Sequence, residues 1–186
     1  TGGRAMERLV ESGFVQGVID ATTTEVADEI VGGVFPAGPD RFERILKARV
    51  PLVLSVGALD MVNFGGLESV PEQFRNRNLH VHNAQVTLMR TNKEENAQFA
   101  TWIVDKLNQS TAPLTIVIPE QGVSMLDAPG QPFHDPEADA ALFDGIDLAL
   151  EQTDSRRIVR LPMHINDPEF SASLVSEYQQ LAPKSH

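Results

Sequence analysis

Short apolar runs alternate along this sequence with longer stretches in which apolar residues recur at helical spacing. The runs predict strands at 14–20, 51–56, 79–82, 114–118 and 157–161. The longer stretches predict helices at 3–12, 24–30, 40–49, 92–108 and 137–150, and a last helix that begins at 168. Strands that alternate with helices form parallel sheets. The pattern therefore predicts an α/β, three-layer Rossmann-like domain with a mainly parallel sheet and helices on both faces.

Residues that favour helix starts and loops support this assignment. Four helix starts have predicted N-caps, with proline after the last two: Asp40, either Thr91 or Asn92, Asp135 and Asp167. Gly- and Pro-rich or polar stretches predict loops at 31–39, 57–69 and 119–136. The last loop is long for a compact domain, and such loops usually have a function.

Polar residues follow the predicted strands and define one rim of the domain. In parallel sheets, ligands bind outside the carboxyl ends of the strands. The sequence therefore predicts a binding site among residues 20–24, 55–63, 119–124 and 162–166, which are rich in Gly, Ser, Thr, Asn and Asp. The whole chain, residues 1–186, is predicted to form a single lobe.

The chain is strongly acidic, with a formal net charge of −11 and a pI near 4.8. This charge argues against a general nucleic-acid-binding surface, which requires clustered Lys and Arg. No apolar run is long enough to span a bilayer, so we expect no membrane partner. The absence of cysteine excludes disulfides, thiolate metal sites and cysteine nucleophiles, and it favours a cytoplasmic protein.

Two glycines, Gly2 and Gly3, open the first predicted helix, and Arg4 follows them. Glycines at a helix start allow a phosphate to approach backbone N–H groups at the positive end of the helix dipole. The complete dinucleotide fingerprint and the lysine-containing phosphate loop are both absent. A phosphate-binding turn and a plain turn are therefore both open interpretations.

A run of hydroxyl and acidic side chains follows the first predicted strand. Asp20 and Glu25 enclose three threonines, Thr22, Thr23 and Thr24. Such a run can hold a phosphate, a ribose or a metal-bound water. Helix capping is the alternative, and it accounts for Thr24 alone.

The motif His80-x-His82 places two imidazoles on one face of a predicted strand. Together with Asp20 or Asp60 they are candidate metal ligands, but a lone His-x-His is a weak signal, so we assign no metal site. The alternative is that these histidines form the wall of a pocket, to which His164 contributes from the end of the last strand.

Ser124 follows the clearest predicted strand and stands close to Gly122. The spacing resembles a nucleophile turn only superficially, because the flanking glycine pattern is different. Ser124 is a better candidate for a hydrogen-bond donor to a ligand. Candidate anion clamps are the arginines at 41, 75, 77 and 90, with a solvated surface role as the alternative for each.

Several long motifs, in order along the chain, carry a resemblance to a known family. They are GGRAMERL, GVIDATTTEVADEIVGG, AGPDRFE, SVGALDMVNFG, HNAQVTLMRTNKEE, IPEQGVSMLDAPGQPFHDPEADAALFDGI and HINDPEF. Together they resemble the second lobe of an uncharacterised protein family that includes the ATP-binding N-terminal region of a plant virus resistance protein. The resemblance covers nearly the whole chain.

The resemblance implies two Rossmann-like lobes with a nucleotide at the cleft between them. The implied ligand is ATP, with Mg²⁺ as its companion ion, and the implied partner is an N-terminal lobe that this sequence lacks. On this view Thr1 falls inside a strand–turn–helix unit. The nucleotide-binding positions carried over are Gly2, Gly3, Arg4, Thr22, Thr23, Thr24, Gly57, Asp60, Asn63, Arg90, Gly122 and Ser124. The family pattern also marks Glu25, His82, Asn83, His164 and Asn166.

Three functional hypotheses follow. The first is a nucleotide-binding lobe of a two-lobed cytoplasmic protein, with its ligand at the strand-end rim. The second is an enzyme for a small anionic or sugar-like substrate that uses His82, Asp20 or Asp60 as acid or base. The third is a protein-interaction module regulated by nucleotide. Homo-oligomerisation is compatible with all three, and the sequence does not decide whether the protein is an enzyme.

Overall fold

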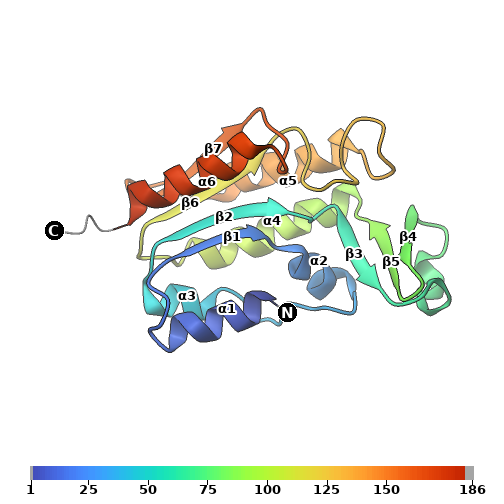
Figure 1. Cartoon of the computed structure of the whole chain (residues 1–186), viewed down its shortest axis with the longest axis horizontal. Helices are drawn as coiled ribbons and strands as arrows, with labels where there is room; N and C mark the ends of the chain where they lie inside the picture. Colours follow the sequence, from blue (N-terminus) through green and yellow to red (C-terminus); the bar gives the residue numbers. More distant parts are fainter. Residues whose placement is uncertain (1, 183–186) are drawn as a thin grey trace.

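A parallel sheet of four strands forms the centre of the molecule (Figure 1). The computed structural model describes residues 2–182, so Thr1 of the predicted opening turn lies outside the described residues. The strand order is β1-β2-β6-β7, and every neighbouring pair is parallel, which confirms the predicted sheet. The strands are β1 (Val18–Thr22), β2 (Leu52–Gly57), β6 (Leu114–Pro119) and β7 (Arg156–Leu161).

The two central strands explain why the sheet is covered on both faces. All residues of β2 and β6 are buried, as their continuous apolar sequences predict. Alternate side chains enter different cores: Leu54 and Ile116 belong to the larger hydrophobic cluster. Val53 and Val117 belong to a smaller cluster with Phe170 on the opposite face.

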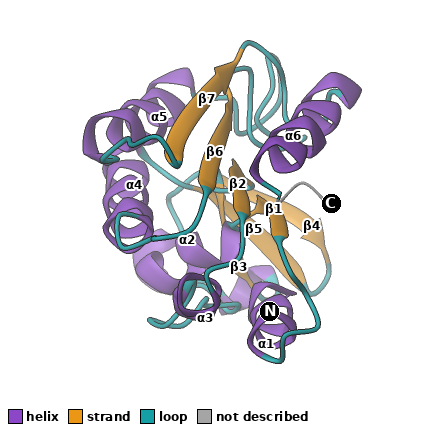
Figure 2. Cartoon of the chain, turned by 90° about the vertical axis from the view of Figure 1, so that its left-hand side faces the viewer, coloured by secondary structure: helices purple, strands orange, loops and turns teal. Residues whose placement is uncertain are grey.

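Helices lie on both faces of this sheet (Figure 2). On one side α4 (Lys93–Leu107) packs against α5 (Pro136–Ala149) and against α2 (Thr24–Val31). On the other side α6 (Pro168–Leu181) packs on β1, β2 and β6. Near β1, α1 (Gly2–Glu11) packs on α3 (Glu43–Ala48). The chain thus leaves β6 toward one face and β7 toward the other.

Two predicted helix starts are confirmed with their capping bonds. The side chain of Asn92 accepts a hydrogen bond from the Glu95 N–H at 2.8 Å, and Glu95 returns the bond in a capping box. Asp135 accepts from the Ala138 N–H at 3.1 Å, with Pro136 at the first helical position.

The other two predicted caps differ from expectation. Asp167 stands at the N-cap of α6, but its carboxylate accepts from the His164 N–H at 2.8 Å instead of capping the helix. The cap predicted at Asp40 is wrong, because α3 starts later, after Phe42 in a left-handed conformation with φ of 76°. Asp40 instead accepts a hydrogen bond from Arg44 at 2.9 Å.

A second sheet, which the sequence pattern did not predict, begins directly after β2 in the chain. It is antiparallel with order β3-β5-β4 and is formed by β3 (Met61–Phe64), β4 (Leu79–Asn83) and β5 (Val86–Arg90). The prediction of a loop over 57–69 is therefore wrong where β3 lies. Of the three strands, only the one near 79–82 was predicted. Polar residues within β3 and β5 interrupt the apolar pattern by which strands are recognised. Two short 3₁₀ helices, Leu67–Ser69 and Glu72–Phe74, connect β3 to β4.

The first strand is shifted from its predicted position. β1 begins at Val18 rather than Phe14, whose side chain is 83% exposed. Gly17 packs against Tyr178 of α6, and this contact marks the point where the chain enters the sheet. Among residues 2–182, no helix has the length and apolar character needed to cross a bilayer.

Candidate functional site

Two separate cavities lie at the strand-end rim, and the predicted site residues are divided between them. The first, here called the β1 cavity, has a volume of about 540 Å³. The second, the β6–β7 cavity, has a volume of about 740 Å³. Five of the predicted nucleotide-binding residues line the β1 cavity: Gly2, Gly3, Thr22, Thr24 and Asn63. Of the others, Gly122 lines the β6–β7 cavity.

The β1 cavity lies where two helices begin. The first residues of α1, Gly2 and Gly3, and the first residue of α2, Thr24, all line it. Helix N-termini carry unpaired N–H groups and the positive end of the helix dipole. A Cβ atom placed on Gly2 would meet nothing within 4 Å, so its backbone is open to approach.

Gly3 has a different role from Gly2. A Cβ atom on Gly3 would lie 2.7 Å from Nε of Arg41, whose side chain is buried against the helix start. The guanidinium of Arg41 is bound by three carboxylates: Glu7 at 2.6 Å, Glu25 at 2.9 Å, and Asp20. We call these four residues the Arg41 cluster. Gly3 is therefore required by close packing on this cluster.

The Arg41 cluster forms the acidic floor of the β1 cavity, since Asp20 and Glu25 also line the cavity. Carboxylates outnumber the guanidinium three to one, and all four side chains are nearly inaccessible to solvent. Burial raises the pKa of Asp20 above its ordinary value, although Arg41 acts in the opposite direction. Because its guanidinium is already satisfied, Arg41 does not act as the anion clamp that the sequence suggested.

The side chains of the three threonines lie on two different sides of the backbone. Thr22 and Thr24 line the β1 cavity, whereas Thr23 is fully buried and donates from Oγ1 to the Ser55 carbonyl at 3.3 Å. Thr23 also occupies the N-cap of α2 without a side-chain capping bond. Helix capping thus does not explain this run.

Asp28 fixes the outer wall of the β1 cavity. Its carboxylate accepts from the backbone N–H groups of Phe35 at 2.8 Å and Asn63 at 2.7 Å, and from the Asn63 side chain. Burial raises the pKa of Asp28 above its ordinary value. These bonds place Asn63 and the Phe35 ring, which is 53% exposed, at the cavity. Phe35 was not among the predicted site residues, although an aromatic residue in a Gly- and Pro-rich loop is a recognisable signal of a binding residue.

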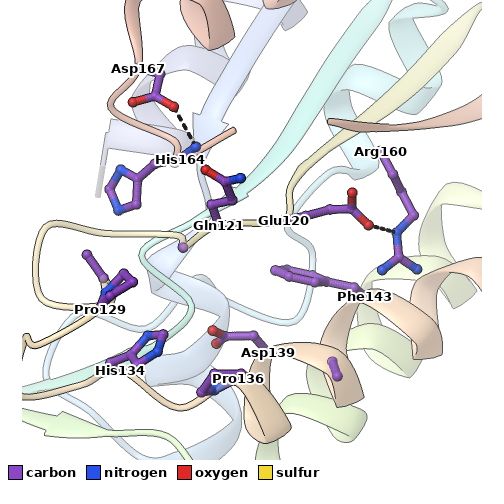
Figure 3. Close-up of a pocket in the computed structure, with 13 residues that line it drawn as sticks. Glu120, Gln121, Pro129, His134, Pro136, Asp139, Phe143, Arg160, His164 and Asp167 are labelled. Carbon is purple, nitrogen blue, oxygen red and sulfur yellow. Dashed lines mark hydrogen bonds and ion pairs between the residues drawn. The ribbon is translucent and has the colours of Figure 1, made fainter. Parts of the chain in front are cut away.

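The β6–β7 cavity lies where the chain leaves β6 and β7 toward opposite faces (Figure 3). Such a divergence is the usual position of a ligand crevice in α/β sheets. Gly122, with φ of 125°, follows β6 in this cavity, and a Cβ atom there would lie 2.7 Å from the His164 ring. The glycine is thus required by its backbone conformation and by the close histidine.

His164 joins the loops that follow β6 and β7. Its Nδ1 accepts from the Asn166 N–H at 3.1 Å, so Nε2 carries the proton that is donated to the Ser124 carbonyl at 2.9 Å. Both ring nitrogens are therefore engaged within the protein. His164 lines the cavity wall, whereas His80 and His82, which the pocket interpretation placed in the same wall, line neither cavity.

Asp60 and Ser124 contact each other beneath the β6–β7 cavity. The Ser124 hydroxyl donates to Asp60 Oδ2 at 2.6 Å and accepts from the Leu126 N–H at 3.0 Å. The Asp60 side chain is fully buried, and this burial raises its pKa to about 6. The Ser124 hydroxyl is thus engaged with a carboxylate and an N–H group, and no histidine of residues 2–182 hydrogen bonds to it.

Arg90 binds two further acids in the same region. It is 5% exposed and lies 2.6 Å from Asp139 and 3.7 Å from Asp127. With Asp60, these residues form what we call the Arg90 cluster. Burial and the neighbouring Asp127 raise the pKa of Asp139 to about 7. The predicted role of Arg90 as a nucleotide clamp would require it to leave these carboxylates.

The remaining predicted residues lie outside both cavity linings. Arg4 of α1 is paired with Asp40 at 3.7 Å. A Cβ atom placed on Gly57 would lie 2.5 Å from the Ala21 carbonyl oxygen and 2.6 Å from Ile165. His80 contacts the edge of the Phe133 ring, whereas His82 is exposed on β4.

In residues 2–182, the structure does not bring together the side chains that a metal site or an acid–base mechanism with His82 would require. Residues 2–182 contain no group of three His, Asp or Glu side chains arranged to hold a metal ion. Within the same residues, Asp20 is bound in the Arg41 cluster and Asp60 to Ser124, and no hydrogen bond links either to His82.

Comparison with known proteins identifies relatives in bacteria and plants. The chain is 54% identical over 182 residues to a UPF0261 protein of Rhizobium meliloti, covering 98% of this chain and 46% of the relative. It is 52% identical over 184 residues to the ToMV resistance protein Tm-1 of tomato, Solanum lycopersicum, covering 99% and 24%. A UPF0261 protein of Clostridium tetani is 47% identical over 183 residues, covering 98% and 45%.

The chain therefore spans less than half the length of these relatives. This coverage agrees with the expectation of one lobe of a larger protein. Residues 1–182 match the C-terminal domain of a family described as uncharacterised. Nearly the whole chain thus belongs to the uncharacterised protein family UPF0261, of which it forms the C-terminal domain.

Proposed function

We propose that this domain binds a nucleotide, ATP together with Mg²⁺, in the β1 cavity. The observation that carries the proposal is the convergence of five predicted residues at the N-termini of α1 and α2. Gly2 and Thr24 come from segments that are separated in sequence, and each begins a helix whose positive end can face a phosphate.

The acidic floor of the cavity favours a metal-bound nucleotide over a bare anion. Asp20 and Glu25 would repel free phosphates, because the only cation bound to them in the cluster is the saturated Arg41. Mg²⁺ is usually bound by one or two carboxylates together with substrate phosphates. A magnesium ion between these acids and the phosphates would turn a repulsive contact into an attractive one.

The outer wall offers a position for the base. The Phe35 ring lines the cavity and is 53% exposed, and its backbone N–H is held by Asp28 at 2.8 Å. An exposed aromatic face stacks on nucleobases with a free energy of about 1–3 kcal/mol. The longer relatives support the further proposal that an N-terminal lobe closes over this wall.

Isothermal titration with ATP tests the proposal. We expect binding in the presence of magnesium and at least tenfold weaker binding in EDTA. Phe35→Ala should weaken binding about fivefold to tenfold, in line with the lost stacking. Phe14→Ala is the matched control, because Phe14 is 83% exposed and lies outside the cavity. An absence of heat with folded protein, or equal losses in the two variants, would contradict the proposal.

A further inference from the structure

The β6–β7 cavity takes no part in the proposed nucleotide site, yet it has the properties of a ligand site. Its volume of about 740 Å³ falls within the range of small-molecule pockets, roughly 300–1,000 Å³. It is formed at the divergence of the chains that leave β6 and β7, where α/β proteins bind ligands. None of the residues that line it also lines the β1 cavity.

Most charged side chains of this cavity are paired within the protein. Arg160 binds Glu120 at 2.7 Å, and two acids of α5, Asp144 at 2.9 Å and Asp147 at 2.5 Å. Asp139 is bound by Arg90 at 2.6 Å. The acids at the wall thus outnumber their arginine, and this excess of negative charge disfavours an anionic ligand.

The groups that face the centre of the cavity suit an uncharged, hydroxyl-bearing ligand. Gln121 and His134 are exposed there and offer both donors and acceptors (Figure 3). The Phe143 ring and Pro129 supply the apolar part of the lining. Arg160 Cζ lies 5.9 Å from the centroid of the Phe143 ring. A sugar presents a similar combination, since its hydroxyls donate and accept while its C–H faces pack on apolar surface.

The floor of the cavity adds an acceptor for a ligand hydroxyl. The Asp139 side chain lines the cavity, and Arg90 holds its Oδ1 at 2.6 Å. Burial and the neighbouring Asp127 raise the pKa of Asp139 to about 7.

We propose that the β6–β7 cavity binds a small neutral sugar or polyol, with Gln121 and Asp139 hydrogen bonding its hydroxyls and Phe143 and Pro129 contacting its C–H face. This site is distinct from the nucleotide site in the β1 cavity. A domain with both sites would hold a nucleotide and a hydroxyl-bearing compound at the same rim of one sheet.

Saturation-transfer NMR on the purified chain tests this proposal. The probes are D-ribose, D-xylose, D-glucose, erythritol and myo-inositol, with citrate and 3-phosphoglycerate as anions of similar size. We expect at least one neutral probe to bind, and the anions to bind at least tenfold more weakly. Ala140→Phe should abolish the signal, because Ala140 is an exposed residue of α5 that lines the cavity.

Ala149→Phe is the matched control, since Ala149 is exposed on the same helix but outside the cavity. If Ala140→Phe does not fold, Gln121→Ala replaces it and should weaken binding at least fivefold. The proposal is overturned if no neutral probe binds, if the anions bind more tightly, or if the cavity variant binds as well as its control. Displacement of the bound probe by Mg-ATP would also overturn it, because the cavity would then be the nucleotide site.

Discussion

The Arg41 and Arg90 clusters each place a buried arginine among several acids beneath one of two neighbouring cavities. The two clusters differ in how completely their polar atoms are hydrogen bonded. Each nitrogen of the Arg41 guanidinium donates to a different carboxylate. In the Arg90 cluster, Arg90 Nε, Asp60 Oδ1 and Asp127 Oδ1 are buried without partners in residues 2–182. A fully bonded cluster serves as a rigid floor, whereas an incompletely bonded one holds protons and responds to pH.

The largest effect should come from removal of the saturated arginine. Arg41→Met leaves three buried carboxylates without their cation, and we expect a loss of about 3–5 kcal/mol in the free energy of unfolding. Arg44→Met is the control, because the ion pairs of Arg44 with Glu11 and Asp40 are partly exposed, and such surface pairs contribute little to stability. Urea unfolding measures both. Similar losses in the two variants would show that the Arg41 cluster is not the structural floor described here.

The two opening glycines should respond differently to the same change. Gly3→Ala forces a Cβ atom to within 2.7 Å of Arg41 Nε, and overpacking of this kind costs about 1–3 kcal/mol. Gly2→Ala has open space and should change the free energy of unfolding by less than about 0.5 kcal/mol. If thermal unfolding shows the two variants to be equally stable, the packing role of Gly3 is disproved.

The Arg90 cluster should make stability depend on pH. Asp60 and Asp139 have pKa values of about 6 and about 7 in the folded protein, above their ordinary value of 3.8. The folded state therefore binds protons that the unfolded state has released, and the free energy of unfolding falls as pH rises from about 4 through 7. We expect a loss of about 1–3 kcal/mol between pH 5 and pH 8.

Asp139→Asn separates this effect from other ionisations. The amide keeps the shape of the protonated acid, so the variant should lose a substantial part of the decline while remaining folded at pH 5. The raised pKa values of Asp20 and Asp28 contribute a decline in the same direction. A stability that rises between pH 5 and pH 8 in urea titrations would contradict the assignment.

The smallest expected effect concerns one hydroxyl at the β1 cavity. Thr24→Val keeps the side-chain shape but removes Oγ1, which lies 3.5 Å from Asn63 Nδ2 at the start of α2. Mg-ATP affinity should fall about twofold to tenfold, equivalent to roughly 0.5–1.5 kcal/mol. Thr101→Val on the exposed face of α4 serves as the control and should leave the affinity measured by titration unchanged.

Local sequence signals predicted the parallel sheet but not the charge clusters. The uninterrupted apolar sequence of β6 and the caps at Asn92 and Asp135 depend on neighbouring residues, so they were identified correctly. β3 was missed because its stability comes from pairing with β5 and from the bonds of Asp28 to Asn63. Neither contact is visible from local periodicity.

The candidate site was predicted in part for the same reason. Residues 20–24 form the carboxyl end of β1 and the start of α2, close to the predicted strand end, so their place at the rim could be inferred. Arg41 contacts Glu7 and Asp20 across 34 and 21 residues, and no spacing rule connects them. The β6–β7 cavity lies where the chain leaves the sheet toward α5 and toward α6 on opposite faces (Figure 2), whereas the β1 cavity lies where α1 and α2 begin.

Backbone NMR of the chain during titration with Mg-ATP can decide which cavity binds the nucleotide, because it reports on both cavities in one experiment. We expect shifts of the amide resonances of Gly2, Thr24, Phe35 and Asn63, which belong to the β1 cavity. We expect only small changes at Gln121, His134 and His164 in the β6–β7 cavity. Shifts confined to the second group, or no shifts at millimolar nucleotide, would contradict a nucleotide site in the β1 cavity.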